Sequence, residues 1–153
     1  FLISGGELYI AGSSGSADAA LDADGGILID GGYVFATGSL GMVETPASHS
    51  SQYCVSFAAS QSLSSGTTLY LCDGNGDVIM YFMVPMDCQS VIISCPEFEN
   101  GRSYSIYGGD SLLTSFTISS TITVIGSEAP VRDPGGMPGG KRPGPDTPGF
   151  GGR

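Results

Sequence analysis

The sequence predicts an all-β protein: the last rungs of a right-handed parallel β-helix, then a small antiparallel β-sandwich cap and a Gly/Pro-rich tail. The first observation is an internal repeat, because residues 3–13 (ISGGELYIAGS) return 26 residues later as residues 29–39 (IDGGYVFATGS). The second is a change of pattern after residue 43, where the repeat gives way to short apolar runs between turn signals. The third is the dense Gly and Pro content from residue 126 onward.

The repeat region, residues 1–43, reads twice as strand, Gly-Gly corner, strand. Short β units of this length stack and bury a shared core, since one unit cannot cover its own apolar face. Alternation puts Leu8 and Ile10 on one face of the first copy and Val34 and Ala36 on the same face of the second. We expect these four side chains to point into the solenoid. The first copy begins in mid-pattern, so we also expect further rungs upstream.

The cap region, residues 44–125, begins with a polar, Pro-containing connector at residues 44–51. Its clearest signal is Asp73-Gly-Asn-Gly-Asp77 between two alternating apolar runs, a strong hairpin turn. A cap over the last rung is expected, because a bare rung exposes unpaired edges and core. The expected strands are residues 53–57, 67–72, 78–84, 90–94, 104–107 and 114–124, the last bent at residues 119–120.

The tail, residues 126–153, is rich in Gly and Pro without the regular Gly spacing of collagen. Such composition is typical of a flexible or polyproline-like linker.

Charge narrows the range of partners. The net charge is −10, and of the five Lys and Arg residues only Arg102 precedes residue 126. Nucleic acid and anionic membrane surfaces bind proteins with clustered Lys and Arg, so we expect neither of them to be a partner of this chain. No apolar run approaches the roughly 20 residues that span a bilayer. The Gly-, Ser- and Thr-rich composition favours a secreted or bacterial cell-surface protein.

Four cysteines, Cys54, Cys72, Cys88 and Cys95, permit three full pairings. If the strands alternate in direction, Cys88 lies at the opposite end of the strands from the other three. We therefore favour a Cys54–Cys95 disulfide. The alternative is four reduced cysteines acting as small buried apolar residues. C-x-x-C spacing is missing from the sequence, which argues against zinc.

The richest acidic cluster contains Asp18, Asp22 and Asp24, on the corner that joins the two repeat copies. With backbone carbonyls these carboxylates would supply the oxygen ligands that Ca²⁺ prefers. The alternative is that they bond only to local backbone N–H groups.

Aromatic side chains alternate with the core positions of both copies. Tyr9, Tyr33 and Phe35 are predicted to point outward, with Tyr9 and Phe35 on adjacent rungs about 4.8 Å apart. A flat aromatic strip of this kind suits stacking of pyranose rings. The alternative is that the strip packs beneath the cap or a loop.

Sequence signals for catalysis are weaker than those for ligand binding. Lyases that act on uronic-acid polymers by β-elimination need an Arg or Lys base beside calcium, and the repeat region has neither. The one histidine, His49, lies in the polar connector and fits a solvated loop residue. No G-x-S-x-G elbow is found in the sequence. We expect a protein that is not an enzyme.

Several short motifs follow one another in a recognisable order: residues 20–26 (ALDADGG), 29–32 (IDGG), 38–42 (GSLGM), 50–53 (SSQY), 73–76 (DGNG), 94–97 (SCPE) and 101–104 (GRSY). In these, residues 1–125 resemble the polysaccharide-lyase-like, carbohydrate-binding β-helix family of clostridia and their relatives. The resemblance implies a secreted, calcium-containing solenoid that binds cellulose-like or pectic polysaccharide without established lyase activity. It also implies that Asp22 and Asp24 are the metal position. Two departures are that most of the solenoid is missing and that cysteines stand where small residues are expected.

The sequence therefore predicts a non-catalytic carbohydrate-binding fragment, with Ca²⁺ either stiffening the corner or bridging to uronate carboxylates. One rival is a structural surface or filament-forming protein that self-associates through solenoid edges and the Gly/Pro tail. The other is a lyase or hydrolase whose active site lies on rungs outside this chain.

Overall fold

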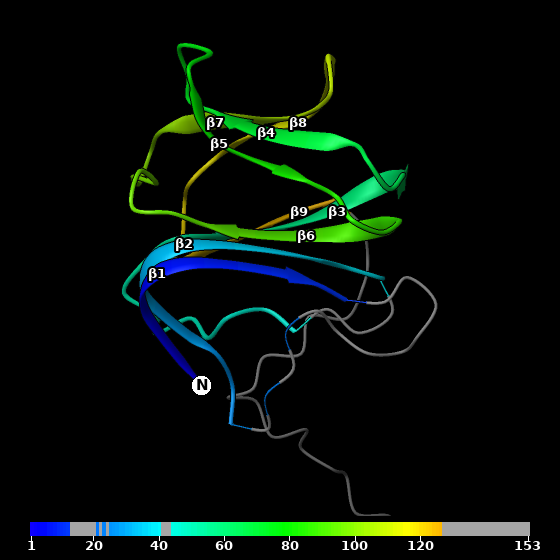
Figure 1. Cartoon of the computed structure of the whole chain (residues 1–153). Helices are drawn as coiled ribbons and strands as arrows, with labels where there is room; N and C mark the ends of the chain where they lie inside the picture. Colours follow the sequence, from blue (N-terminus) through cyan, green and yellow to red (C-terminus); the bar gives the residue numbers. More distant parts are fainter. Residues whose placement is uncertain (13–20, 22, 24, 41–43, 127–153) are drawn as a thin grey trace, which may run out of the picture.

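The computed structural model describes residues 1–12, 21, 23, 25–40 and 44–126. In this part of the chain all regular structure is β, arranged as two open sheets, neither closed into a barrel. Figure 1 shows one sheet lying above the other. No helix in the described residues could cross a bilayer.

The first sheet has five strands in the order β1-β2-β6-β3-β9. They are β1 (Leu2–Ala11), β2 (Leu28–Gly38), β3 (Cys54–Leu63), β6 (Cys88–Ser94) and β9 (Ile122–Ile125). The second sheet has four strands in the order β5-β4-β7-β8. They are β4 (Thr68–Cys72), β5 (Val78–Met83), β7 (Ser103–Gly108) and β8 (Ser111–Thr117).

The two copies of the repeat pair as parallel neighbours, as the sequence predicts. Tyr9 lies opposite Phe35 and Ile3 opposite Ile29, which is the 26-residue shift of the repeat. The predicted inner face is also confirmed: Val34 and Ala36 are buried in a cluster with Ile3, Ile27 and Ile29, against which Leu8 and Ile10 pack. The repeat therefore determines both the register and the inner face of β1 and β2.

The Gly-Gly corners allow β1 and β2 to bend together in Figure 1. Gly32 has φ +91, and a Cβ built there would lie 2.7 Å from the carbonyl oxygen of Gly6 and 2.8 Å from the carbonyl carbon of Gly5. Only glycine combines this backbone conformation with so close an approach between neighbouring chains. The pairing shifts register at the same corner.

The predicted hairpin is present as β4 and β5, paired antiparallel around the turn. One carboxylate oxygen of Asp73 accepts hydrogen bonds from the backbone N–H groups of Asn75 and Asp77, both at 2.9 Å. The predicted strand 114–124 is instead two strands, β8 and β9, which belong to different sheets. The chain passes from one sheet to the other near the expected bend.

The strands after residue 43 do not all form a separate antiparallel unit. β6 pairs antiparallel with β2 through Phe35 and Ile93, and it also pairs with β3. β3, β6 and β9 thus extend the sheet that the repeat begins, so the expected boundary at 43/44 does not separate the two sheets. The larger core lies between the sheets and includes Phe35, Val55, Leu69, Leu71, Val91, Ile93, Tyr104, Ile106 and Ile118. The predicted tail lies outside the described residues, except for Gly126.

Candidate functional site

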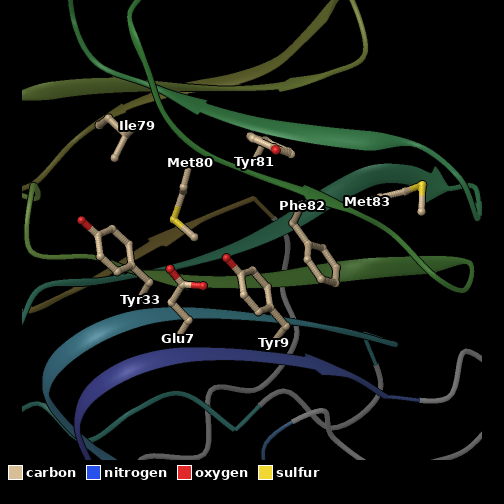
Figure 2. A pocket seen from close by; sticks show the side chains of 8 residues that line it. All are labelled: Glu7, Tyr9, Tyr33, Ile79, Met80, Tyr81, Phe82 and Met83. Carbon is tan, nitrogen blue, oxygen red and sulfur yellow. The ribbon is translucent and has the colours of Figure 1, made fainter.

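An open groove of about 720 Å³ lies between two edge strands, β1 of the five-stranded sheet and β5 of the four-stranded sheet. Figure 2 shows side chains from both strands directed into it. The lining residues are Glu7, Tyr9, Tyr33, Ile79, Met80, Tyr81, Phe82 and Met83. Two of the three predicted ligand-binding aromatics, Tyr9 and Tyr33, are therefore brought together here.

Tyr9 offers the most accessible ring on the β1 side of the groove. Its side chain is 46% exposed. Its ring is stacked on that of Phe82, with centroids 5.3 Å apart and planes 6° from parallel. Phe82 in turn contacts Phe35, with centroids 4.6 Å apart. These contacts fix the orientation of the exposed Tyr9 ring, because Phe82 packs against it and is itself held by the buried Phe35.

Phe35 differs from the sequence-based expectation. It is on the predicted face, the one opposite Val34, yet it is 0% exposed and belongs to the core between the sheets. The reason is that the four-stranded sheet covers this face at Phe35, whereas Tyr9 and Tyr33 remain accessible at the groove. Phe35 therefore supports the groove rather than lining it.

Tyr33, next to the end of the β2–β6 pairing, is anchored to the segment that follows β6. Its hydroxyl donates a hydrogen bond of 2.5 Å to Oε1 of Glu97. The hydrogen bond, together with desolvation and the nearby negative charge, raises the pKa of Tyr33 to about 12. With its hydroxyl committed to Glu97, Tyr33 presents mainly its ring to the groove.

The groove carries negative but no positive charge among the described residues. Glu7 lines it and is exposed. Arg102 pairs instead with Glu99, with Nε and Oε2 3.0 Å apart. The groove thus combines aromatic surface with a carboxylate that can accept hydrogen bonds from hydroxyl groups.

The cysteines carry free thiols in the structure, so the expected Cys54–Cys95 disulfide is not formed. The physical reason is the alternation along the sheet: Cys54 packs into the cluster beneath the five-stranded sheet, whereas Cys95 packs between the two sheets. Burial raises the pKa of the Cys54 thiol far above its usual value, that of Cys88 to about 11 and that of Cys95 to about 12. Burial also raises the pKa of Cys72.

The predicted calcium ligands Asp18, Asp22 and Asp24 lie outside the described residues. Within the described ranges, no group of three or more His, Cys, Asp or Glu side chains could hold a metal ion. Asp30 at the next corner accepts hydrogen bonds from the backbone N–H and the hydroxyl of Ser51, at 3.1 and 2.9 Å. Its carboxylate therefore stabilises the local backbone.

Comparisons with known proteins found no relative: no family model, curated protein or solved structure matches the chain.

The sequence did not predict that β5 forms one side of the groove. Its residues 79–83 reach the groove only because the two sheets face each other, a relationship between strands that are distant in the sequence. The one signal for it was the alternation of apolar residues in the predicted hairpin.

Proposed function

We propose that this chain binds polysaccharide without transforming it, and that the groove between β1 and β5 is the binding site. The observation that carries the proposal is the exposed Tyr9 ring, held flat against Phe82 beside Tyr33 and Glu7. A ring fixed in this way loses little conformational entropy when a sugar stacks on its free face. The adjacent carboxylate gives a hydrogen-bond acceptor for sugar hydroxyls.

The groove is open, which suits a polymer better than a small metabolite. Sites for small molecules are usually enclosed and bury most of the ligand surface. Here the ligand would lie along two strand edges and contact mainly aromatic and methionine side chains. The proposed ligand class is plant-type or cell-surface polysaccharide, either cellulose-like or pectic.

Calcium is proposed as a cofactor on the basis of Asp18, Asp22 and Asp24. It would stiffen the corner that contains them, or it would bridge this acidic protein to the carboxylates of a pectic chain. The wider proposal is a secreted or cell-surface protein in which β1 and β2 are the last rungs of a parallel β-helix. The parallel pairing of the two repeat copies supports that arrangement.

Isothermal titration calorimetry with cello-oligosaccharides and with polygalacturonate tests the proposal. Wild-type protein should bind one of these ligands, and Tyr9→Ala should weaken that binding about tenfold through loss of the stacking surface. Tyr9→Phe is the matched control, because it keeps the ring and should bind as the wild type does. If Ca²⁺ bridges the protein to the carboxylates of the pectic chain, EDTA should abolish the binding of polygalacturonate. Absence of binding to both ligands would refute the proposed function.

A structural role in assembly is the second candidate. It is favoured by the position of β1, which pairs only with β2 among the described strands and so has an open edge. Electron microscopy of the purified protein separates the two roles, since filaments would support assembly and monodisperse particles would contradict it.

A further inference from the structure

The outer face of the four-stranded sheet, the face turned away from the core, carries a row of tyrosines across three strands. Tyr81 of β5 lies opposite Tyr70 of β4, and Tyr70 lies opposite Tyr107 of β7. Residues that are directly opposite one another in a sheet project on the same side. The rings of Tyr70 and Tyr81 are 6.2 Å apart and tilted by 37°. We call Tyr81, Tyr70 and Tyr107 the tyrosine row.

Hydroxyl groups flank the tyrosine row on the same face. Ser105 and Ser115 share a hydrogen bond of 2.9 Å between β7 and β8, and Ser103 and Thr117 share one of 2.8 Å. The alternate residues of these strands, such as Tyr104, Ile106 and Phe116, are buried in the core. The two faces of the sheet are thus sharply different: apolar inside, tyrosine and hydroxyl outside.

The charge distribution on this face is unusual for an acidic protein. None of the residues of β4, β5, β7 and β8 is charged, although the chain has a net charge of −10. Solvent-facing sides of antiparallel sheets ordinarily carry polar and charged side chains. An uncharged face of rings and hydroxyl groups is complementary to a neutral, polyhydroxylated ligand. The strands themselves offer no charged partner to an ionic ligand.

One end of the face is hollowed. A depression of about 390 Å³ is lined by Ser103, Ser105, Tyr107 and Ser115 of the sheet, and by Cys72 and the β4–β5 turn at residues 73–76. The one charged side chain in this lining is Asp73, whose carboxylate accepts hydrogen bonds from the backbone of the turn. Neighbouring strands are about 4.8 Å apart, so the tyrosine row extends about 10 Å from Tyr81 to Tyr107. That length exceeds a single sugar ring, and the depression continues it with hydrogen-bonding groups.

We propose that this outer face is a second glycan-binding surface, which takes an extended neutral polysaccharide chain across the tyrosine row. The inference rests on the proposed function, because it extends the same ligand class to a second surface. Tyr81 is common to the two sites: it lines the groove and begins the tyrosine row. A chain held in the groove can therefore continue over the outer face.

The experiment uses two probes. Amorphous cellulose, measured by depletion of protein from solution, offers extended chains to both surfaces. Cellotetraose, measured by calorimetry, is a short ligand for the groove. The test variant is Tyr70→Ala/Tyr107→Ala, and its control is Tyr70→Phe/Tyr107→Phe, which retains both rings. Tyr81 is left unchanged because it belongs to both sites.

Tyr70→Ala/Tyr107→Ala should lower the affinity for amorphous cellulose about tenfold through loss of ring stacking. Affinity for cellotetraose should remain that of the wild type, and the double phenylalanine control should keep both affinities. An unchanged affinity of the double alanine variant for amorphous cellulose would overturn the second surface. If cellotetraose binds but Tyr9→Ala does not weaken it, the groove fails while the second surface can still stand.

Sedimentation velocity completes the test. The wild-type protein and the double alanine variant should sediment as the same species. A wild-type dimer that becomes monomeric in the double alanine variant would identify the face as a contact between copies of this chain, which overturns the proposal. Circular dichroism of both variants verifies that the sheet is retained.

Discussion

Tyr9 and Phe35 occupy the same register position on two parallel strands, yet one side chain is exposed to solvent and the other is buried. Tyr9 is 46% exposed in the groove, whereas Phe35 is 0% exposed between the two sheets. Phe82 links them, because its ring contacts both. The repeat places the two rings one strand apart, and the second sheet decides which of them meets solvent.

Alanine substitution should affect mainly the free energy of unfolding at Phe35 and mainly polysaccharide binding at Tyr9. Phe35→Ala should lower the free energy of unfolding by about 3–5 kcal/mol, since it removes a fully buried ring. Tyr9→Ala should lower it by about 1 kcal/mol, the contribution of the stacked pair, while it weakens polysaccharide binding. Urea unfolding gives both values. Equal losses of stability would show that the two rings do not differ in burial as described.

The corner between β1 and β2 should not tolerate a side chain at Gly32. Gly32→Ala introduces a strained positive φ and a clash with the backbone of Gly5 and Gly6, so it should cost about 3 kcal/mol or more. Gly76→Ala is the matched control: it also has positive φ but no atom within 4 Å of the added Cβ, so it should cost only about 1–2 kcal/mol. Thermal unfolding measures the difference, and equal effects would mean that the close approach is absent.

The thiols should be unreactive in the folded protein and all free after unfolding. Burial of the four cysteines and their raised pKa values keep the thiolate fraction low near pH 8. Titration with a disulfide reagent should therefore be slow in native buffer, and all four thiols should react in guanidinium chloride. Only two reactive thiols in denaturant would instead indicate a disulfide, as the sequence-based pairing of Cys54 and Cys95 predicts.

The hydrogen bond between Tyr33 and Glu97 should be visible in an alkaline titration. Because the folded-state pKa of Tyr33 is raised to about 12, its stabilising contribution is complete below the ordinary tyrosine pKa of 10 and is lost as the pH rises toward 12. Glu97→Gln should lower the pKa of Tyr33, since it removes the negative charge at the acceptor. Ultraviolet difference spectra compared with those of Tyr33→Phe identify this residue. An unchanged titration curve in Glu97→Gln would contradict the assignment.

The local features of this fold could be predicted from the sequence, whereas the relationships between distant strands could not. The repeat fixed the pairing of Ile3 with Ile29, and the Asp73–Asp77 segment fixed the β4–β5 hairpin, because both depend on residues close to the elements themselves. The pairing of β6 with β2 has no comparable local signal. It determines that β3, β6 and β9 extend the repeat's sheet instead of forming a separate cap.

The candidate site shows the same division. Tyr9 and Tyr33 were identified by alternation along β1 and β2, which reports the face on which a side chain lies. Alternation does not report what covers that face, so the burial of Phe35 and the contribution of Phe82 could not be anticipated. The tyrosine row was missed for a similar reason, since its members come from three strands whose register is set only in the folded sheet.

Glycan binding in the groove between β1 and β5 can be followed residue by residue, by titrating ¹⁵N-labelled protein with cellotetraose and recording the backbone amide resonances. Saturable shifts are expected at residues 7–10 of β1, at residue 33 and at residues 79–83 of β5, and in Tyr9→Ala these shifts should need about tenfold more sugar to saturate. Shifts confined to other strands, or a spectrum unchanged at saturating sugar, would contradict binding in this groove.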